Sequence, residues 1–240
     1  MNDQSAGILS KNNILKKLRL KTKNKLVITP LIDHNKQISA GAVDLRLNTE
    51  FIVTKRTRFT LLNPIINKEK LDLSIKEYQE KTYVKLGAGL VLHPNQFALG
   101  STLEYIKLPH DLTAYVVGRS SWGRLGLIIA TAPVIHPGFS GSITLELTNV
   151  GDAPIILYPG IRIAQLVLHN TQKGEEDEPS KYQYAVGPKF SDIHRDKELG
   201  ILKKLNEEEQ NEIPFNILKS LLEKQQITKE MYDELKNALS

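Results

Sequence analysis

Two arginines and two serines stand close together in the stretch GRSSWGRLGL, residues 118–127. A guanidinium group fits phosphate oxygens, hydroxyl and backbone N–H groups can complete a cradle around an anion, and glycine lets the backbone approach the ligand closely. The stretch therefore predicts an anion-binding turn. Glycine-containing turns with a basic residue are common, so this motif alone does not identify the anion.

A single carboxylate, Glu146, interrupts the apolar alternation of GSITLELTN, residues 141–149. Side chains at alternate positions of a strand share one face. Carboxylates are poor strand formers, so Glu146 is either a residue on a solvated face or a functional acid in a cleft. The apolar face of this strand consists of Ile143, Leu145 and Leu147, and the polar face consists of Ser142, Thr144, Glu146 and Thr148.

Short apolar or alternating runs must position these residues. They extend from KLVITPLI at residues 25–32 to RIAQLVLHN at residues 162–170 and are rich in Val, Ile, Thr and Leu. Gly, Pro, Asn or Asp separates them at intervals of roughly ten residues, the pattern of a β-sandwich or barrel. We expect a mainly β domain over residues 1–196.

The basic stretch KNNILKKLRLKTKNK, residues 11–25, precedes these runs. Its spacing predicts an amphipathic helix that turns Ile14, Leu15 and Leu18 inward and its lysines toward solvent. Nucleic-acid binding is the minor alternative, because no aromatic residues for base stacking interleave the charges.

The period changes from two to about 3.6 beyond residue 197. Pro214 suits the first turn of one helix and Thr228 the cap of another. Residues 197–240 therefore predict a helical hairpin, which either stabilises the main domain or recruits a protein partner through residues 214–239.

Composition excludes several classes of protein. The chain has 240 residues, a net charge of +5 and no cysteine, so disulfides, thiol nucleophiles and thiolate zinc sites are excluded. No apolar run approaches the ~18 residues of a membrane span, and the polar N-terminus lacks a secretory apolar segment. We expect a cytoplasmic protein that binds no membrane.

Six blocks of the sequence resemble, in order and spacing, the dCTP deaminase branch of the dUTPase-like superfamily. The resemblance covers residues 7–195 and implies a distorted β-barrel, a homotrimer and active sites assembled between subunits. The blocks are AGAVDLRL (40–47), LHPNQFALGSTLEYIKLP (92–109), GRSSWGRLGL (118–127), TAPVIHPGFSGSITLELTN (131–149), PIILYPGIRIAQLVL (154–168) and SKYQ (180–183).

The resemblance implies hydrolytic deamination of dCTP to dUTP and ammonia. Glu146 aligns with the catalytic glutamate of the family, which serves as general acid and base. Ser120 and the backbone carbonyl of Ala132 would hold the attacking water, and Arg124 would orient the catalytic groups beside the pyrimidine. Deaminases that activate water with zinc need cysteine ligands, so the composition fits a reaction without a catalytic zinc ion.

The same resemblance assigns the substrate-binding residues. Arg119 and Ser121 would bind the triphosphate, Lys181 would add a phosphate contact, and Mg²⁺ would arrive bound to the nucleotide. Tyr182 either closes over the nucleotide or pins the tail to the main domain. His136 stands where the family has an aspartate that contacts the sugar, so it is either a substrate contact or a loop residue.

Three departures from the family pattern lie near the base and sugar. His136 replaces the aspartate, Val134 replaces an arginine, and Ala185 replaces a glutamine. The aspartate takes part in water activation in the sister diphosphatases, so its replacement disfavours hydrolysis of dUTP. A dUTP diphosphatase, a bifunctional enzyme and a deoxynucleotide-binding regulator acting through the C-terminal helices remain alternatives.

Asp44 and Arg46 alternate in AVDLRLN, residues 42–48. They form either an ion pair between subunits or, as is usual for opposite charges on a strand, part of a solvated face.

Overall fold

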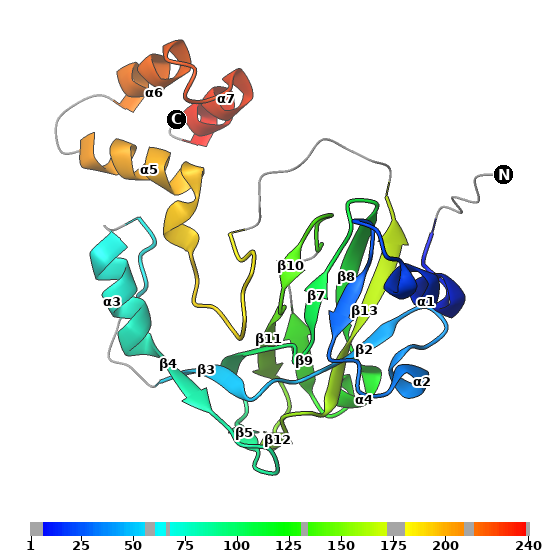
Figure 1. Ribbon diagram of the computed structural model, residues 1–240. Coiled ribbons are helices and arrows are strands. Elements are labelled where there is room, and N and C mark those ends of the chain that lie inside the picture. The colour runs from blue at the N-terminus through cyan, green and yellow to red at the C-terminus, as the bar shows by residue number, and fades with distance from the viewer. Residues whose placement is uncertain are drawn as a thin grey trace. The chain divides into compact units, whose positions relative to one another are not determined.

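The computed structural model describes residues 7–55, 61–65, 68–130, 134–171, 181–208 and 214–238. The chain divides into two compact units (Figure 1). Unit 1 comprises residues 1–57 and 77–190, and unit 2 comprises residues 58–76 and 191–240.

Unit 1 contains the strands, which form four antiparallel sheets within the described residues. Their orders are β1-β7-β10, β4-β3-β6-β11-β9, β12-β5 and β2-β13-β8. The strands are β1 (Val27–Thr29), β2 (Val43–Arg46), β3 (Glu50–Thr54), β4 (Gln79–Tyr83), β5 (Leu90–Leu92), β6 (Phe97–Ser101), β7 (Tyr105–Lys107), β8 (Leu112–Gly118), β9 (Leu127–Ala130), β10 (Ser140–Gly141), β11 (Thr144–Asn149), β12 (Ile155–Leu157) and β13 (Arg162–Asn170).

One large apolar cluster fills unit 1. The alternation of the strands supplies it, as in β11, where Leu145 and Leu147 are fully buried. Each such side chain contributes about 1.5–3 kcal/mol when it leaves water. Phe51 of β3 is the largest fully buried side chain among the described residues.

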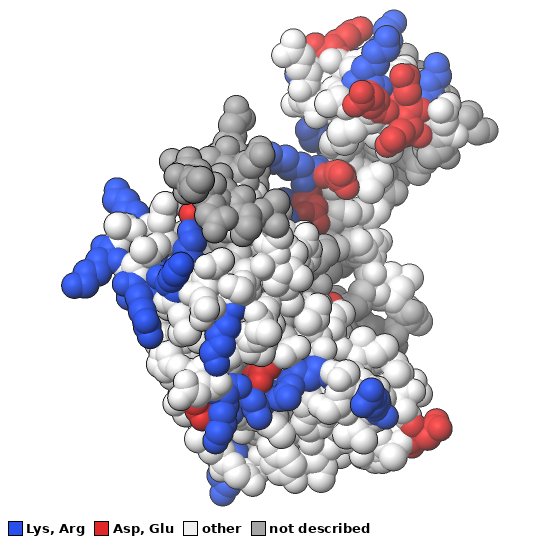
Figure 2. All heavy atoms as spheres, turned by 90° about the vertical axis from the view of Figure 1, so that its right-hand side faces the viewer, with Lys and Arg blue, Asp and Glu red and all other residues white. Residues whose placement is uncertain are grey.

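The N-terminal helix α1 (Lys11–Arg19) is capped by Ser10, whose hydroxyl accepts from the Asn13 N–H at 3.4 Å. Ile14 is buried, and Leu15 and Leu18 pack against the core, as the spacing predicts. Figure 2 shows Lys and Arg side chains gathered on the face of unit 1 that carries α1 and α2 (His34–Gln37). The exposed basic residues around α1 are Lys16, Arg19, Lys21, Lys23 and Lys25.

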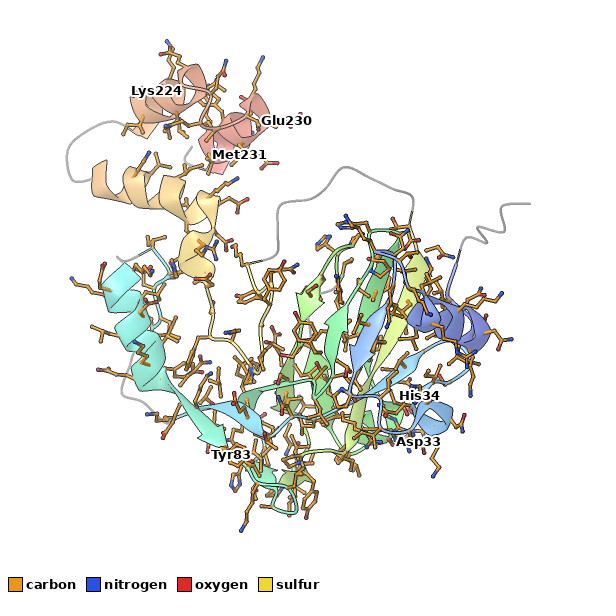
Figure 3. The ribbon with its side chains drawn as sticks, in the orientation of Figure 1. Asp33, His34, Tyr83, Lys224, Glu230 and Met231 are labelled. Atoms are coloured by element: carbon orange, nitrogen blue, oxygen red, sulfur yellow. The ribbon has the colours of Figure 1, made fainter. Side chains whose placement is uncertain are left out.

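Asp33, labelled in Figure 3, is the N-cap of α2, and its carboxylate accepts from the N–H groups of Asn35 and Lys36, both at 3.1 Å. The N–H of Lys36 makes the largest contribution to lowering the pKa of Asp33. The helix buries Gln37, whose side-chain amide donates to the Asp44 carbonyl of β2 at 3.2 Å and to Glu104 Oε1 at 3.1 Å.

Unit 2 has a small core of its own, made by Leu218, Leu221 and Ile227. Pro214 opens α6 (Pro214–Glu223), and the Thr228 hydroxyl accepts from the Met231 N–H at 3.3 Å at the start of α7 (Lys229–Ala238). Figure 3 labels Lys224, which follows α6, and Glu230 and Met231 of α7. Two further helices, α5 (Lys197–Glu208) and α3 (Lys68–Tyr78), and the 3₁₀ turn η1 (Ile193–Arg195) were not predicted.

The mainly β fold with an N-terminal helix and C-terminal helices is confirmed. In the part of the chain that the structure describes, no helix combines the length and apolar character that crossing a bilayer requires.

Candidate active site

Four residues of the 118–127 stretch lie in one tight turn. We call it the arginine turn, and its members are Arg119, Ser120, Ser121 and Arg124. Strand β8 leads into it, Arg119 is the N-cap and Arg124 the C-cap of α4 (Ser120–Gly123), and the Arg124 N–H donates to the Ser120 carbonyl at 3.0 Å. Ser120, Ser121 and Arg124 are exposed, and Arg119 is partly buried. The turn therefore presents hydroxyl and guanidinium groups outward, as an anion cradle requires.

Gly126 and Trp122 fix the position of this turn. Gly126 has a φ of +93°, and a Cβ there would lie 2.8 Å from the Gly151 nitrogen, so only glycine allows the two backbones to approach. The Trp122 ring packs against the core, and its Nε1–H donates to the Arg162 carbonyl at 3.2 Å.

A buried carboxylate lies beside the arginine turn. Asp44 is only 5% exposed, which contradicts the solvated face considered from its alternation with Arg46. Its Oδ2 lies 2.9 Å from Arg162 Nη1 and 3.9 Å from Arg119 Nη1. Arg46 has a different partner, because its Nη1 donates to the Gly160 carbonyl at 2.7 Å. Sequence reasoning missed this cluster.

Glu146 lies exposed on β11 between two buried leucines. It stands opposite Leu99 of β6 and Ala130 of β9 in the sheet. The predicted alternation holds along β11, but Ser142 just before the strand is buried.

His136 begins a turn in which Pro137 and Gly138 occupy the central positions. The Phe139 N–H donates to the His136 carbonyl at 3.2 Å, and Gly138 has a φ of +78°, the geometry of a type II turn. His136 is exposed, and the preceding Ile135 bridges to Ala114 of β8.

The segment of residues 181–187 docks along β10 and this turn. The Gln183 amide donates to the Gly138 carbonyl at 3.0 Å and accepts from the Ser140 N–H at 3.2 Å. The Ser142 hydroxyl donates to the Ala185 carbonyl at 3.2 Å and accepts from the Gly187 N–H at 2.9 Å. These bonds bring the predicted contacts at Lys181 and Tyr182, both exposed, to the part of unit 1 that carries the His136 turn.

Gln183 and Ser142 are positioning residues that sequence reasoning did not assign. Gln183 belongs to the SKYQ block, and that neighbourhood was the available signal. Their partners lie 43 to 45 residues away in the chain, a distance that local periodicity does not register.

Within one copy of the chain, the predicted site residues fall into two groups: the arginine turn, and the residues that lie apart from it, which include the His136 turn and Glu146. Ile135 pairs with Ala114, while the arginine turn follows Gly118 four residues later, so about 13 Å of strand separates the His136 turn from the arginine turn. Glu146 pairs with Ala130, about 10 Å along β9 from Leu127 at the arginine-turn end. Ala132 lies outside the described residues.

A second carboxylate, Glu104, is completely buried next to β2. Its Oε2 accepts from the Arg46 N–H at 2.8 Å and its Oε1 accepts from the Gln37 amide at 3.1 Å. Burial is the largest effect on this group and raises the pKa of Glu104.

Residues 8–171 match the family model described as dCTP deaminase-like. The dCTP deaminase of Natronomonas pharaonis is 41% identical over 199 residues, which cover 80% of this chain and 98% of that protein. The protein of Methanobrevibacter smithii named dCTP deaminase, dUMP-forming, is 43% identical over 182 residues, 73% of this chain and 91% of that protein.

Among solved structures, 2'-deoxycytidine 5'-triphosphate deaminase from Agrobacterium tumefaciens shares the fold, with a TM-score of 0.53 at 22% identity. That match covers 70% of this chain and 49% of the other.

Proposed function

The chain belongs to the dCTP deaminase-like family, and from this membership we propose that it converts dCTP and water to dUTP and ammonia, with Glu146 as general acid and base. The observation that carries this proposal is the match of residues 8–171 to the dCTP deaminase-like family model, and the exposed position of Glu146 on β11 leaves its carboxylate open to a ligand. A carboxylate held on a rigid strand but open to a ligand can exchange protons with that ligand.

The reaction at C4 of cytosine requires four proton movements. The Glu146 carboxylate takes a proton from the attacking water and passes it to N3. It then takes the remaining proton from the new C4 hydroxyl group and delivers it to the departing amino group, so that ammonia leaves and a C4 carbonyl remains. Ser120 and the Ala132 carbonyl hold the water, and Arg124 orients the catalytic groups. None of these steps uses a metal ion; Mg²⁺ enters with the triphosphate.

The triphosphate binds to Arg119 and Ser121, and Lys181 and Tyr182 close on it from a neighbouring copy. The separation of the two groups of residues within one copy supports a site shared between subunits. Exposed apolar side chains also support a homotrimer, because they need a partner surface to leave water. They are Tyr115 and Val117 of β8, Leu125 beside α4, Ile128 of β9 and Val150 after β11.

Incubation with dCTP and with dUTP, followed by chromatographic separation of the products, tests the activity. Formation of dUTP and ammonia from dCTP supports the proposal. Tight binding of dCTP without product overturns it and favours a nucleotide-binding regulator. Light scattering of the purified protein measures the oligomeric state, and a monomer at assay concentrations overturns the shared site.

A dUMP-forming enzyme is the second candidate, because the relative from Methanobrevibacter smithii carries that name. This candidate requires hydrolysis of the triphosphate as well as deamination. His136 stands where the family resemblance places the aspartate for that hydrolysis, so we propose that the reaction stops at dUTP. Release of dUMP and pyrophosphate from either substrate contradicts this limit.

A further inference from the structure

The carboxylate of Asp44 contacts two side chains of the neighbouring strand β13 and lies close to Arg119 of the arginine turn. Oδ2 accepts from Arg162 Nη1 at 2.9 Å and lies 3.9 Å from Arg119 Nη1. Oδ1 accepts from the Gln165 amide at 2.8 Å. A buried charge needs partners of this kind, because burial without them carries a large cost.

The register of the sheet explains how these groups meet. Asp44 of β2 stands opposite Gln165 of β13, so the two side chains share a face. A β-bulge lies between Arg162 and Ala164, and it pairs Arg162, in place of Ile163, with Arg46. The bulge therefore brings a guanidinium group to Asp44 and leaves Ile163 in the core.

The two guanidinium groups are held differently. Arg162 forms a hydrogen-bonded ion pair with Asp44 and also donates to the Lys36 carbonyl at 3.1 Å. Arg119 Nη1 lies 1 Å farther from the carboxylate, beyond hydrogen-bond distance. The negative charge of Asp44 can thus orient Arg119 while the donors of Arg119 stay available. Two cations against one carboxylate also leave one positive charge for an anionic ligand.

We propose that Asp44 is a positioning residue that holds Arg119 in the orientation in which it binds the substrate triphosphate. Arg162 is the second partner that keeps Asp44 from drawing Arg119 fully inward. This inference rests on the proposed binding of the triphosphate at the arginine turn. It explains the orientation of Arg119 by the ion pair of Asp44 and Arg162, two residues that stand 118 positions apart in the chain.

Asp44→Asn tests the inference, because two physical effects of this change have opposite signs. Loss of orientation weakens triphosphate binding, whereas removal of a negative charge near the phosphates strengthens it. We expect KM for dCTP and the inhibition constant of inorganic tripolyphosphate to rise about tenfold to a hundredfold, the range for lost hydrogen bonds to charged groups. The inhibition constant of deoxycytidine, which lacks phosphate, and kcat should change less than about twofold.

Glu80→Gln is the matched control. Glu80 lies on β4 and forms an exposed ion pair with Lys55, so this change also removes one carboxylate. It should leave all four constants unchanged. Equal or tighter binding of tripolyphosphate to Asp44→Asn overturns the inference, and so does an equal loss of deoxycytidine binding, which indicates a purely structural role.

Arg162→Gln keeps the inference testable if Asp44→Asn does not fold. Asp44 then has Arg119 as its remaining guanidinium partner, and we expect Arg119 to turn inward and tripolyphosphate binding to weaken. Unchanged tripolyphosphate binding in a folded Arg162→Gln variant overturns the inference. Failure of the wild-type protein to deaminate dCTP overturns the proposed function instead, so the two failures are distinguishable.

Discussion

The arginine turn and the 181–187 segment both carry predicted triphosphate contacts, but they are fixed by different forces. A buried carboxylate with ionic partners lies beside the arginine turn. Neutral hydrogen bonds from Gln183, Ser142 and the backbone hold the 181–187 segment. The charged hydrogen bond of this cluster joins Arg162 to Asp44 and is roughly twice as strong as a neutral one, and Arg119 lies 3.9 Å from the same carboxylate. The comparison indicates a rigid grip on one side of the site and a more easily displaced contact on the other.

Glu146 differs from the arginine turn and from the 181–187 segment, because its carboxylate is exposed on β11 between two buried leucines. Its position comes from the sheet, so replacing its carboxylate should affect the reaction and not the architecture.

Glu146→Gln should have the largest effect. The amide keeps the size of the side chain but cannot accept and return a proton, so we expect kcat to fall about 10²- to 10⁴-fold. Binding of dCTP, measured by calorimetry, should change little, because the arginine turn and the 181–187 segment are intact. Near-normal turnover by this variant removes Glu146 from the mechanism, and Glu80→Gln controls for the loss of one surface carboxylate.

Co-expression of Glu146→Gln and Arg119→Gln subunits should restore activity that each variant lacks. If a site combines the acid of one copy with the arginine turn of another, about a quarter of the sites in randomly mixed trimers have both wild-type residues. The specific activity of the mixed trimers should then approach a quarter of the wild-type value. Activity no higher than the average of the separate variants places both residues in one subunit and contradicts the shared site.

The residues that sequence reasoning located are those whose position follows from local order. The arginine turn lies between Gly118 and Gly126. The two-residue period of β11 places Glu146 on the face of the strand opposite to that of Leu145 and Leu147. Alternation along one strand determines which face a side chain occupies, whatever the partner strands are.

The residues that it missed depend on pairings between distant segments. Asp44 is buried because Arg162 and Gln165, 118 and 121 residues later, reach it across a bulged register. A bulge reverses the face of a residue without a sequence signal as strong as alternation. Helix α3 was missed as well: Leu71 and Ile75 are buried four residues apart, a short apolar stripe among charged residues.

Gly141→Ala should loosen the 181–187 segment. A Cβ at this position would lie 3.1 Å from the Ala185 nitrogen and 3.2 Å from its oxygen, in a backbone conformation with φ of +154°. We expect KM for dCTP to rise about threefold to tenfold, because Lys181 moves away from the phosphates while the arginine turn remains. Steady-state kinetics measures the change.

Gly7→Ala is the control for backbone conformation, since Gly7 has a φ of +131° and no atom within 4 Å of the added Cβ. An equal effect of the two changes assigns the result to backbone conformation and contradicts a role for the contact with Ala185.

The smallest effect is expected at Glu104, the buried carboxylate whose donors are neutral. Burial raises the pKa of Glu104, so above the unfolded pKa the folded protein keeps a proton that the unfolded chain has released. The contribution of Glu104 to the unfolding free energy then falls as pH rises from about 4.5, the ordinary value, through the raised pKa. Glu104→Gln resembles the protonated acid and does not titrate. We expect it to unfold within about 1 kcal/mol of the wild type at the acidic end and to gain stability relative to the wild type as pH rises.

Asp33→Asn, at the N-cap of α2, should change stability with pH in the opposite direction. The N–H of Lys36 and other hydrogen bonds lower the pKa of Asp33, so the stability that its carboxylate contributes is present above the unfolded pKa and is lost as pH falls. As pH rises, the unfolding free energy of the wild type should therefore increase relative to that of Asp33→Asn and decrease relative to that of Glu104→Gln. Urea denaturation at several pH values measures both differences. Differences that change with pH in the same direction contradict the assignment, because both groups would then be held by the same kind of environment.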